Sequence, residues 1–343
     1  MDSQELRAAS HRVFARGEVW AFISVLCYTA ISLLIRRATG RGDRSVAVTL
    51  RALPAFLLTL GVVLASPRRR AQLRPNSEEF IGWKAIGAVV VQALLIFSVG
   101  NSLNFESLKY AGVTITAPVS SMSVIFGGLL ALLMLREIFN WEMLGGMIVT
   151  TVGVLVLAQG QAMGTPVSEH WLRGVSYSLI GAICASIGGV LLTYALRRGT
   201  DIFVAMLLST AVAILSMVIV QGTQGRLALY WTSPPEVVRD LLLAGAVNAV
   251  SLLAITQALA LSPWAVAMTI TRLSVVFSPL AAVVFLGEHI NAIMFAGILL
   301  VVLGVIAVQW GQALGQRRLD EAATAEKDAE KEKKRIPFER TPI

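Results

Sequence analysis

Long apolar runs are the feature that most constrains what this chain can fold into. A helix needs roughly 20 apolar residues to cross the core of a bilayer, and ten runs of about that length follow one another here. Lipid offers backbone amides no hydrogen-bond partner, and the runs are too long for barrel strands, so each is predicted to be a transmembrane helix. The predicted spans are 19–36, 46–65, 84–105, 112–135, 142–159, 174–196, 202–221, 237–260, 264–286 and 292–311.

The composition agrees with a membrane protein. Hydrophobic residues make up 56% and charged residues 15% of the 343 residues, against about 45–50% and about 25% in soluble domains. The net charge of +8 does not indicate nucleic acid, because the basic residues flank the spans and fill the tail. Cys27 and Cys184 lie in apolar runs and are too few for a disulfide framework or a thiolate metal site, so we expect no metal and no cofactor. The polar, arginine-bearing start does not resemble a cleavable signal peptide.

The chain repeats itself. A shift of 151 residues aligns 123–154 with 274–305 without a gap, and twelve of these thirty-two positions are identical. Because each half holds five predicted spans, an odd number, the second half must be inverted relative to the first. The predicted fold is therefore an all-α integral membrane protein, with ten transmembrane helices in two inverted five-helix repeats around a central cavity. Such repeats recur in secondary transporters that work by alternating access.

Lys and Arg set the expected orientation, because they are enriched in cytoplasmic loops. A cytoplasmic start places nineteen of them on that side and eight on the other. We therefore expect a multi-pass protein of the plasma membrane (the bacterial inner membrane) with both termini cytoplasmic. The expected divisions are a cytoplasmic N-terminal segment (1–17), a first repeat (18–160), a connecting loop (161–173), a second repeat (174–312) and a charged, solvated, at most briefly helical cytoplasmic tail (313–343).

The two halves close with similar passages, "LREIFNWEMLGGMIVTTVGVLVL" and "LGEHINAIMFAGILLVVLGVIAV". These passages, together with Arg51 early in the second span, resemble the drug/metabolite transporter superfamily, in particular its bacterial branch with tandem EamA domains. The first copy departs from the pattern, with Arg136 where Gly287 stands in the second. The resemblance covers about 18–312. It implies a central cavity with the fifth and tenth helices outside it, and movement of small organic metabolites, often by export, but it does not fix the substrate.

Charges inside the spans are the first candidates for a site, because each costs at least about 2.5 kcal/mol at mid-bilayer. Arg272 lies about eight residues into the ninth span, roughly 12 Å deep. We expect it to face the cavity, where a guanidinium binds a carboxylate or a phosphate. Pairing with helix-end carbonyls or with Glu106 is an almost equally weighted alternative. Glu106 and Arg51 lie at similar depths, which favours an ion pair, and Glu106 is the one acidic candidate for proton coupling.

Neutral polar residues complete the set. Helical spacing puts several of them on shared faces, and the predicted substrate-binding residues besides Arg272 are Trp20, Tyr28, Asn101, Asn104, Ser120, Asn248 and Thr271. Pro118 and Pro279 lie inside the fourth and ninth spans, where a proline permits a kink, and we predict hinges there. Glu137, Asn140, Glu288 and Asn291 precede the fifth and tenth spans, where corner fixing and helix capping are favoured over substrate binding.

These patterns predict a secondary transporter of a small amphipathic or anionic metabolite such as an amino acid, and the family resemblance implies export. A carrier of lipid-linked compounds or cationic drugs is the alternative. An intramembrane enzyme is disfavoured because the spans carry no nucleophile–base pair and no metal motif. The expected partners are the substrate, the lipid bilayer and protons as a candidate coupling ion, in a monomer or a homodimer and without nucleic acid.

Overall fold

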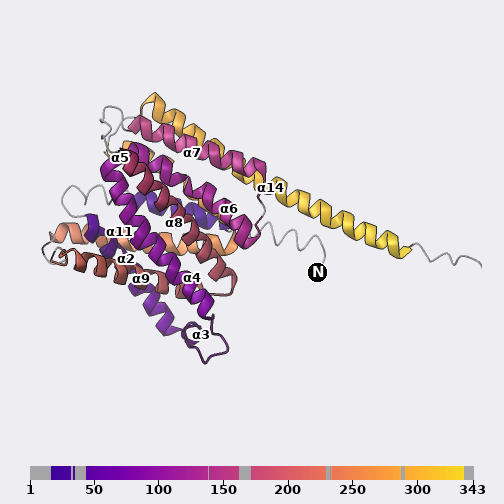
Figure 1. Ribbon diagram of the computed structural model, residues 1–343, viewed down its shortest axis with the longest axis horizontal. Helices are drawn as coiled ribbons and strands as arrows, with labels where there is room; N and C mark the ends of the chain where they lie inside the picture. Colours follow the sequence, from indigo (N-terminus) through magenta and orange to yellow (C-terminus); the bar gives the residue numbers. More distant parts are fainter. Residues whose placement is uncertain are drawn as a thin grey trace, which may run out of the picture.

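The computed structural model describes residues 17–31, 34, 44–137, 139–161, 171–228, 232, 234–286 and 290–335. In these ranges every regular element is a helix, and the helices pack side by side into a bundle from which the end of α14 projects (Figure 1). The bounds, in chain order, are Gly17–Ile31 for the first helix, α2 (Arg44–Ala65), α3 (Pro67–Ala71), α4 (Trp83–Ala93), the π-helix η1 (Leu94–Gly100), α5 (Asn101–Ser121), α6 (Ser123–Leu135), α7 (Trp141–Gln161), α8 (Trp171–Arg197), α9 (Ile202–Thr223), α11 (Pro235–Leu261), α12 (Trp264–Thr271), α13 (Ser274–Leu286) and α14 (Ala292–Arg335).

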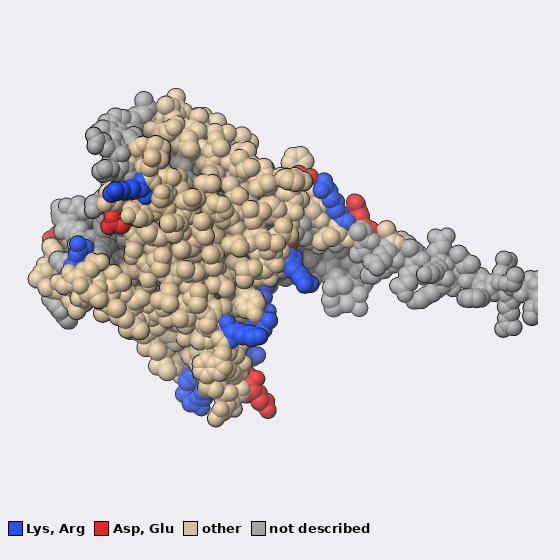
Figure 2. All heavy atoms as spheres, viewed as in Figure 1, with Lys and Arg blue, Asp and Glu red and all other residues tan. Residues whose placement is uncertain are grey.

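The apolar helices coincide with the predicted spans. Among the described residues, seven helices are long and apolar enough to cross a membrane. The remaining three predicted spans coincide with the shorter apolar helices Gly17–Ile31, Thr49–Ala65 and Val119–Leu135. Charged side chains gather at two opposite edges of the visible face, and a belt without them separates these edges (Figure 2). Such a belt is the surface expected of a protein whose middle faces lipid.

The chain reverses direction within α5. The hydroxyl oxygens of Ser107 and Thr116 are hydrogen-bonded at 2.7 Å, although nine residues of straight helix would separate them by about 13.5 Å. Helix α8 packs against both arms of this bend. Ser107 donates to the carbonyl of Gly174 at 2.8 Å, and Ser178 donates to the carbonyl of Thr116 at 3.1 Å. The bend therefore separates the third and fourth predicted spans, and α8 of the second half packs against the first half.

The first helix makes the equivalent contact with the second half. The Ser24 and Ser251 hydroxyl groups are hydrogen-bonded at 3.1 Å, which joins the first helix to α11. Gly17 lies against Ser262 at the end of α11, just as Gly174 lies against Ala111 at the bend of α5. Ser262 follows Ala111 by the same 151 residues, and Gly174 follows Gly17 by 157 residues, so the two contacts correspond in the two halves with a small difference in length. Each half thus packs its first helix against the other half.

The fourth and ninth predicted spans are both interrupted. Met122 separates α5 from α6, and Arg272 with Leu273 separates α12 from α13. Met122 and Leu273 are equivalent positions in the 151-residue repeat. Met122 lies four residues after Pro118, and Arg272 and Leu273 lie seven and six residues before Pro279, so neither interruption coincides with a proline. Whether the two helices bend during a transport cycle, as predicted for the prolines, stays a prediction.

Helices α7 and α14 pack along their length in opposite directions. The Asn140 side chain accepts from the Met143 amide at 2.9 Å and donates to the Gly311 carbonyl at 2.6 Å. The Asn291 side chain accepts from the Met294 amide at 2.8 Å and donates to the Gly160 carbonyl at 2.8 Å. The residues correspond in pairs that are each 151 residues apart, so this contact is two-fold symmetric. The pairs are Asn140 with Asn291, Met143 with Met294, and Gly160 with Gly311. Each asparagine caps its own helix and ties it to the far end of the other.

The charged C-terminal segment differs from the expectation of a mostly irregular tail. Helix α14 continues without interruption to Arg335 and extends beyond the bundle (Figure 1). An ion pair of 2.9 Å between Arg318 and Glu142 joins it to the start of α7. The residues after the span are rich in Ala, Glu and Lys, which have high helix propensity, so the helix can propagate from the membrane-embedded part.

Candidate functional site

A cavity of about 200 Å³ lies between the bent third and fourth spans, α8 and the break in the ninth span. Because α8 and Arg272 belong to the second half, both halves contribute to its wall. Its lining residues are Ile96, Gly100, Asn101, Asn104, Ser120, Ser123, Ser178, Gly181, Ala182, Ala185 and Arg272. Among these, Arg272 is the one charged residue, and the others are small, amide, hydroxyl or aliphatic side chains. The cavity therefore offers hydrogen-bond donors and one positive charge.

Arg272 is the first residue of the break between α12 and α13, and its side chain reaches α6. The Nη2 atom donates to the Ser123 hydroxyl at 2.7 Å. The Nε atom is buried, and no described residue accepts a hydrogen bond from it. A buried guanidinium N–H without an acceptor is costly. Arg272 thus combines a place in the cavity wall with an N–H that no described residue accepts, and a guanidinium in such a wall can bind a carboxylate or phosphate oxygen.

The structure brings four of the predicted substrate-binding residues together. Arg272, Asn101, Asn104 and Ser120 line one cavity, although they come from the third, fourth and ninth spans. Ser120 also has a polar partner. The amides of the two asparagines supply both donors and acceptors. A small solute with an anionic end and a polar end could therefore be held from two sides.

The other predicted binding residues do not line the cavity. Tyr28 lies close enough to Arg51, Arg272 and Ser251 for its hydroxyl group to be influenced by each of them. Asn248 is buried in α11, while Thr271 is buried and donates to the Met268 carbonyl at 2.7 Å. Trp20 on the first helix is 38% exposed. Tyr28 is thus the member of this group that has a link to the cavity arginine.

The remaining predicted residues have separate positions. Arg51 lies on α2 and interacts electrostatically with Tyr28, whereas Glu106 is exposed near the bend of α5 and has an interaction partner. The predicted pairing of these two stays a prediction. Pro279 is buried within α13, and the backbone of Pro118 lies in α5. Glu288 lies outside the described residues.

Sequence reasoning missed the contribution of α8. Ser178, Gly181, Ala182 and Ala185 recur every three or four residues on one face of this helix and form one wall of the cavity. Small residues at this spacing allow close helix packing as well as an open wall. The spacing was visible in the sequence, but it does not distinguish these two roles. Among the described residues, no group of three or more His, Cys, Asp or Glu could hold a metal ion.

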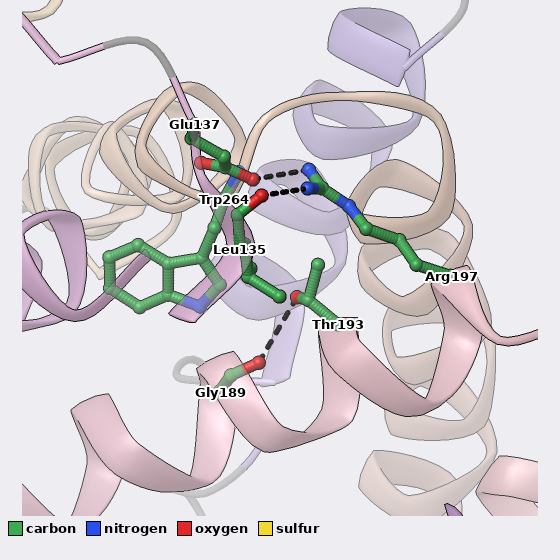
Figure 3. A network of polar contacts seen from close by, with 6 residues as sticks. All are labelled: Leu135, Glu137, Gly189, Thr193, Arg197 and Trp264. Atoms are coloured by element: carbon green, nitrogen blue, oxygen red, sulfur yellow. Dashed lines mark hydrogen bonds and ion pairs between the residues drawn. The ribbon is translucent and has the colours of Figure 1, made fainter. Parts of the chain in front are cut away.

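A second polar cluster lies at one end of the bundle, where α6 and α8 end and α12 begins (Figure 3). The Glu137 carboxylate accepts from the Trp264 amide, with both oxygen atoms at 3.0 Å, and it forms an ion pair with Arg197. Arg197 also donates to the Leu135 carbonyl at 3.3 Å. Burial raises the pKa of Glu137 above its usual range, and the Trp264 amide and Arg197 offset this effect only in part. The cluster connects the first half to the second.

Comparison with known proteins identifies the family to which this sequence belongs. The sequence model of the EamA-like transporter family matches residues 15–159 and again residues 172–310, which is most of the chain and both halves of the repeat. The chain belongs to the EamA-like transporter family. This confirms the resemblance to the drug/metabolite transporter superfamily. It also supports two repeats in a multi-pass membrane protein, because the EamA-like family is a family of membrane transporters.

A solved structure supports the fold of this EamA-like transporter. A chain whose published description is only "Crystal structure of protein" superposes with a TM-score of 0.70 at 16% sequence identity, over 88% of this chain and 98% of that one. At this identity the likeness concerns the fold alone. No curated protein matches the sequence.

Proposed function

We propose that this EamA-like protein is a secondary transporter that exports a small anionic or zwitterionic metabolite, such as an amino acid. One observation carries the proposal: Arg272 lines the cavity between the two halves, and its buried Nε has no acceptor among the described residues. The cavity of about 200 Å³ is smaller than the roughly 300–1,000 Å³ typical of sites for drug-sized ligands. A small solute with one carboxylate fits both the charge and the size.

Alternating access between two inverted repeats of five helices is the mechanism we infer. The symmetric contact of α7 with α14 supports it, because each asparagine cap binds the far end of the opposite helix. The exchange of first helices between the halves supports it as well. Two similar halves packed in this way can interchange their conformations, and the cavity between them then faces each side of the membrane in turn. Pro118 and Pro279 remain the proposed hinges.

The alternative substrates are cationic drugs or lipid-linked compounds. Within the described part of the chain, the lining residues include one cation and no carboxylate. A cationic substrate would meet an unfavourable charge there, so the observation favours anions. An enzymatic role has no group to support it in this cavity, because its hydroxyl residues have no neighbouring base among the lining residues.

We also propose the placement in the membrane. The chain would lie in a bacterial inner membrane with both termini cytoplasmic, 18–160 and 174–312 would form the repeats, and 313–343 would form the charged tail. This places Glu137, Arg197 and the arginines of α3 on the cytoplasmic side, in keeping with the preference of basic residues for that side. Glu106 stays the candidate for proton coupling, and a monomer or a homodimer is equally compatible with the bundle.

Counterflow in proteoliposomes tests the substrate class. A panel of labelled amino acids and small carboxylates should exchange through the wild-type protein, and Arg272→Ala should weaken their apparent affinity by about tenfold or more, because hydrogen bonds to a charged group contribute about 1.5–3 kcal/mol. Arg272→Lys should retain part of the activity, since it keeps the charge. Arg239→Ala is the matched control, because that arginine is exposed and pairs with Asp240. Equal exchange of anionic solutes by Arg272→Ala and the wild type would refute the assignment.

A further inference from the structure

The Trp264 side chain does not line the cavity but is buried next to it in the bundle. The residue is 1% exposed, and its indole ring occupies a slot between α6 and α8. A Cβ atom added to Gly127 would lie 1.8 Å from the ring, and one added to Gly189 would lie 2.7 Å from the indole nitrogen. Only glycine leaves room for the ring at these two positions. The slot is therefore shaped for this tryptophan.

The slot lies about one helical turn beyond the cavity lining. Gly127 follows the lining residue Ser123 by four residues on α6, and Gly189 follows the lining residue Ala185 by four residues on α8. Four residues are about one helical turn, or roughly 6 Å. Both helices run from the cavity toward the end that holds Glu137 and Arg197. The ring of Trp264 thus separates the cavity from that end of the bundle.

Trp264 is hydrogen-bonded through its backbone N–H, whereas its indole N–H is not hydrogen-bonded to any described residue. The indole N–H has no acceptor among the described residues, whereas the backbone N–H is held by the Glu137 carboxylate (Figure 3). Glu137 is in turn paired with Arg197, and this pair joins the ends of α6 and α8. A buried N–H without a partner opposes the seating of the ring. The carboxylate, placed at the positive N-terminus of α12, favours it.

We propose that Trp264 is the floor and the movable plug of the cavity, and that Glu137 with Arg197 is the latch that keeps the plug seated. Withdrawal of the start of α12 would remove the ring from the glycine slot and open the cavity toward the latch end, meaning the end of the bundle that holds Glu137 and Arg197. Glu137 is then a positioning residue, because it acts on the cavity through Trp264. The proposal rests on the alternating access proposed above and names the closing element of one side.

Thiol accessibility tests the plug without any substrate. In a background with Cys27→Ser and Cys184→Ala, the substitution Ala185→Cys places one thiol on the cavity wall. A membrane-impermeant anionic thiosulfonate reagent is added to right-side-out or to inverted vesicles, and the rate of modification is measured for each side. When Trp264, Glu137 and Arg197 are unsubstituted, the reagent should modify the thiol at position 185 slowly from the latch end.

Two variants should raise the rate from the latch end by about tenfold or more, which corresponds to about 1.4 kcal/mol in the closing equilibrium. Glu137→Ala removes the latch, and Gly127→Ala displaces the ring from its slot. Glu137→Gln, which keeps an acceptor for the Trp264 amide, should remain nearer to the unsubstituted rate. If Glu137→Ala does not accumulate in the membrane, Arg197→Gln tests the same latch at a position that is 38% exposed, with the same expected rise.

Two matched controls should leave the rate unchanged. Glu142→Ala breaks the exposed ion pair with Arg318, and Gly145→Ala adds a Cβ where no atom lies within 4 Å. The proposal is overturned if the folded latch and slot variants modify no faster than the parent, or if the controls rise equally. The assay is independent of the transported solute. Failed counterflow together with a shifted labelling rate would therefore refute the proposed substrate class and keep the plug.

Discussion

At the scale of single residues, the buried carboxylate of Glu137 has a measurable consequence for stability. Burial raises its pKa above the usual value of 4.5, so the folded protein binds this proton more tightly than the unfolded chain does. The contribution of the group is therefore fully present below pH 4.5 and is lost as the pH rises through the raised pKa. We predict that the thermal midpoint of the detergent-solubilised wild type falls over this window.

The matched variant for this prediction is Glu137→Gln, which does not titrate. Its thermal midpoint should change less with pH between about 4.5 and neutrality, measured by the same melting assay in the same detergent. Both proteins share all other titrating groups, so the difference between the two profiles isolates Glu137. Parallel profiles would show that this carboxyl has the same pKa in the folded and the unfolded chain.

Single residues also show the limit of sequence reasoning about the site. Arg272 was predicted to face the cavity because a charge in a span is costly, and it lines the cavity. The partner of Arg272 was not predictable: Ser123 lies 149 residues away in the sequence. Trp264 had no signal of its own, because its role depends on two glycines in other helices. A sequence can indicate which residue has a high free-energy cost of burial in the membrane, but not which residues surround it.

At the scale of helices, the contact between α7 and α14 is set by glycines at equivalent positions of the repeat. A Cβ added to Gly153 would lie 2.5 Å from the backbone nitrogen of Val301, and one added to Gly304 would lie 2.5 Å from the backbone nitrogen of Thr150. Backbone atoms cannot give way as a flexible side chain can. The two helices would have to separate, which removes contacts along their whole length.

We therefore predict that Gly153→Ala destabilises the protein by about 1–3 kcal/mol, the usual cost of overpacking. Gly304→Ala should have a similar effect, because the contact is symmetric. Gly145→Ala, on the same helix but facing open space, should be neutral or slightly stabilising, since alanine favours a helix. Thermal unfolding in detergent measures all three. A loss of stability in Gly145→Ala equal to that of Gly153→Ala would contradict this account of the contact.

Helix positions were predictable from the sequence, whereas helix shape was not. The apolar runs located the spans because hydrophobic length is a strong signal. The interruptions at Met122 and at Arg272 with Leu273 carry no such signal, because the Ser and Thr residues beside them also occur inside unbroken helices, as Ser186 and Thr193 do in α8. The helical tail beyond the last span was underestimated for a related reason. Its polar composition resembles that of a disordered segment, yet a preformed helix removes the cost of nucleation.

At the scale of the whole molecule, the internal repeat was the most informative property of the sequence. It predicted which positions would be equivalent, and the contacts of Asn140 and Asn291 obey that equivalence. The sequence did not predict that the first helix of each half would pack against the other half. Exchange of this kind depends on long-range packing, on which the pattern of apolar residues within one span has no bearing.

The direction in which the chain crosses the membrane yields the last prediction. Five predicted spans lie between the loop after α3 and the turn after α9, and an odd number of crossings puts these two segments on opposite sides. The arginine-rich α3 should be cytoplasmic, because basic loops are retained on that side. Asn76 and Gln224 are both exposed and lie in these two segments. In the background with Cys27→Ser and Cys184→Ala, either Asn76→Cys or Gln224→Cys then supplies the single thiol of the protein.

In intact cells, an impermeant maleimide should modify Gln224→Cys, and it should modify Asn76→Cys only after permeabilisation. Denatured protein, in which both thiols react, serves as the control for reactivity. Modification of both thiols from the same side would leave an even number of crossings between them. In that case the halves could not be inverted, because the fold needs five helices in each. The reversed pattern would keep the inverted repeats and place the Glu137 latch on the outer side of the membrane, so that the plug would close the opposite entrance.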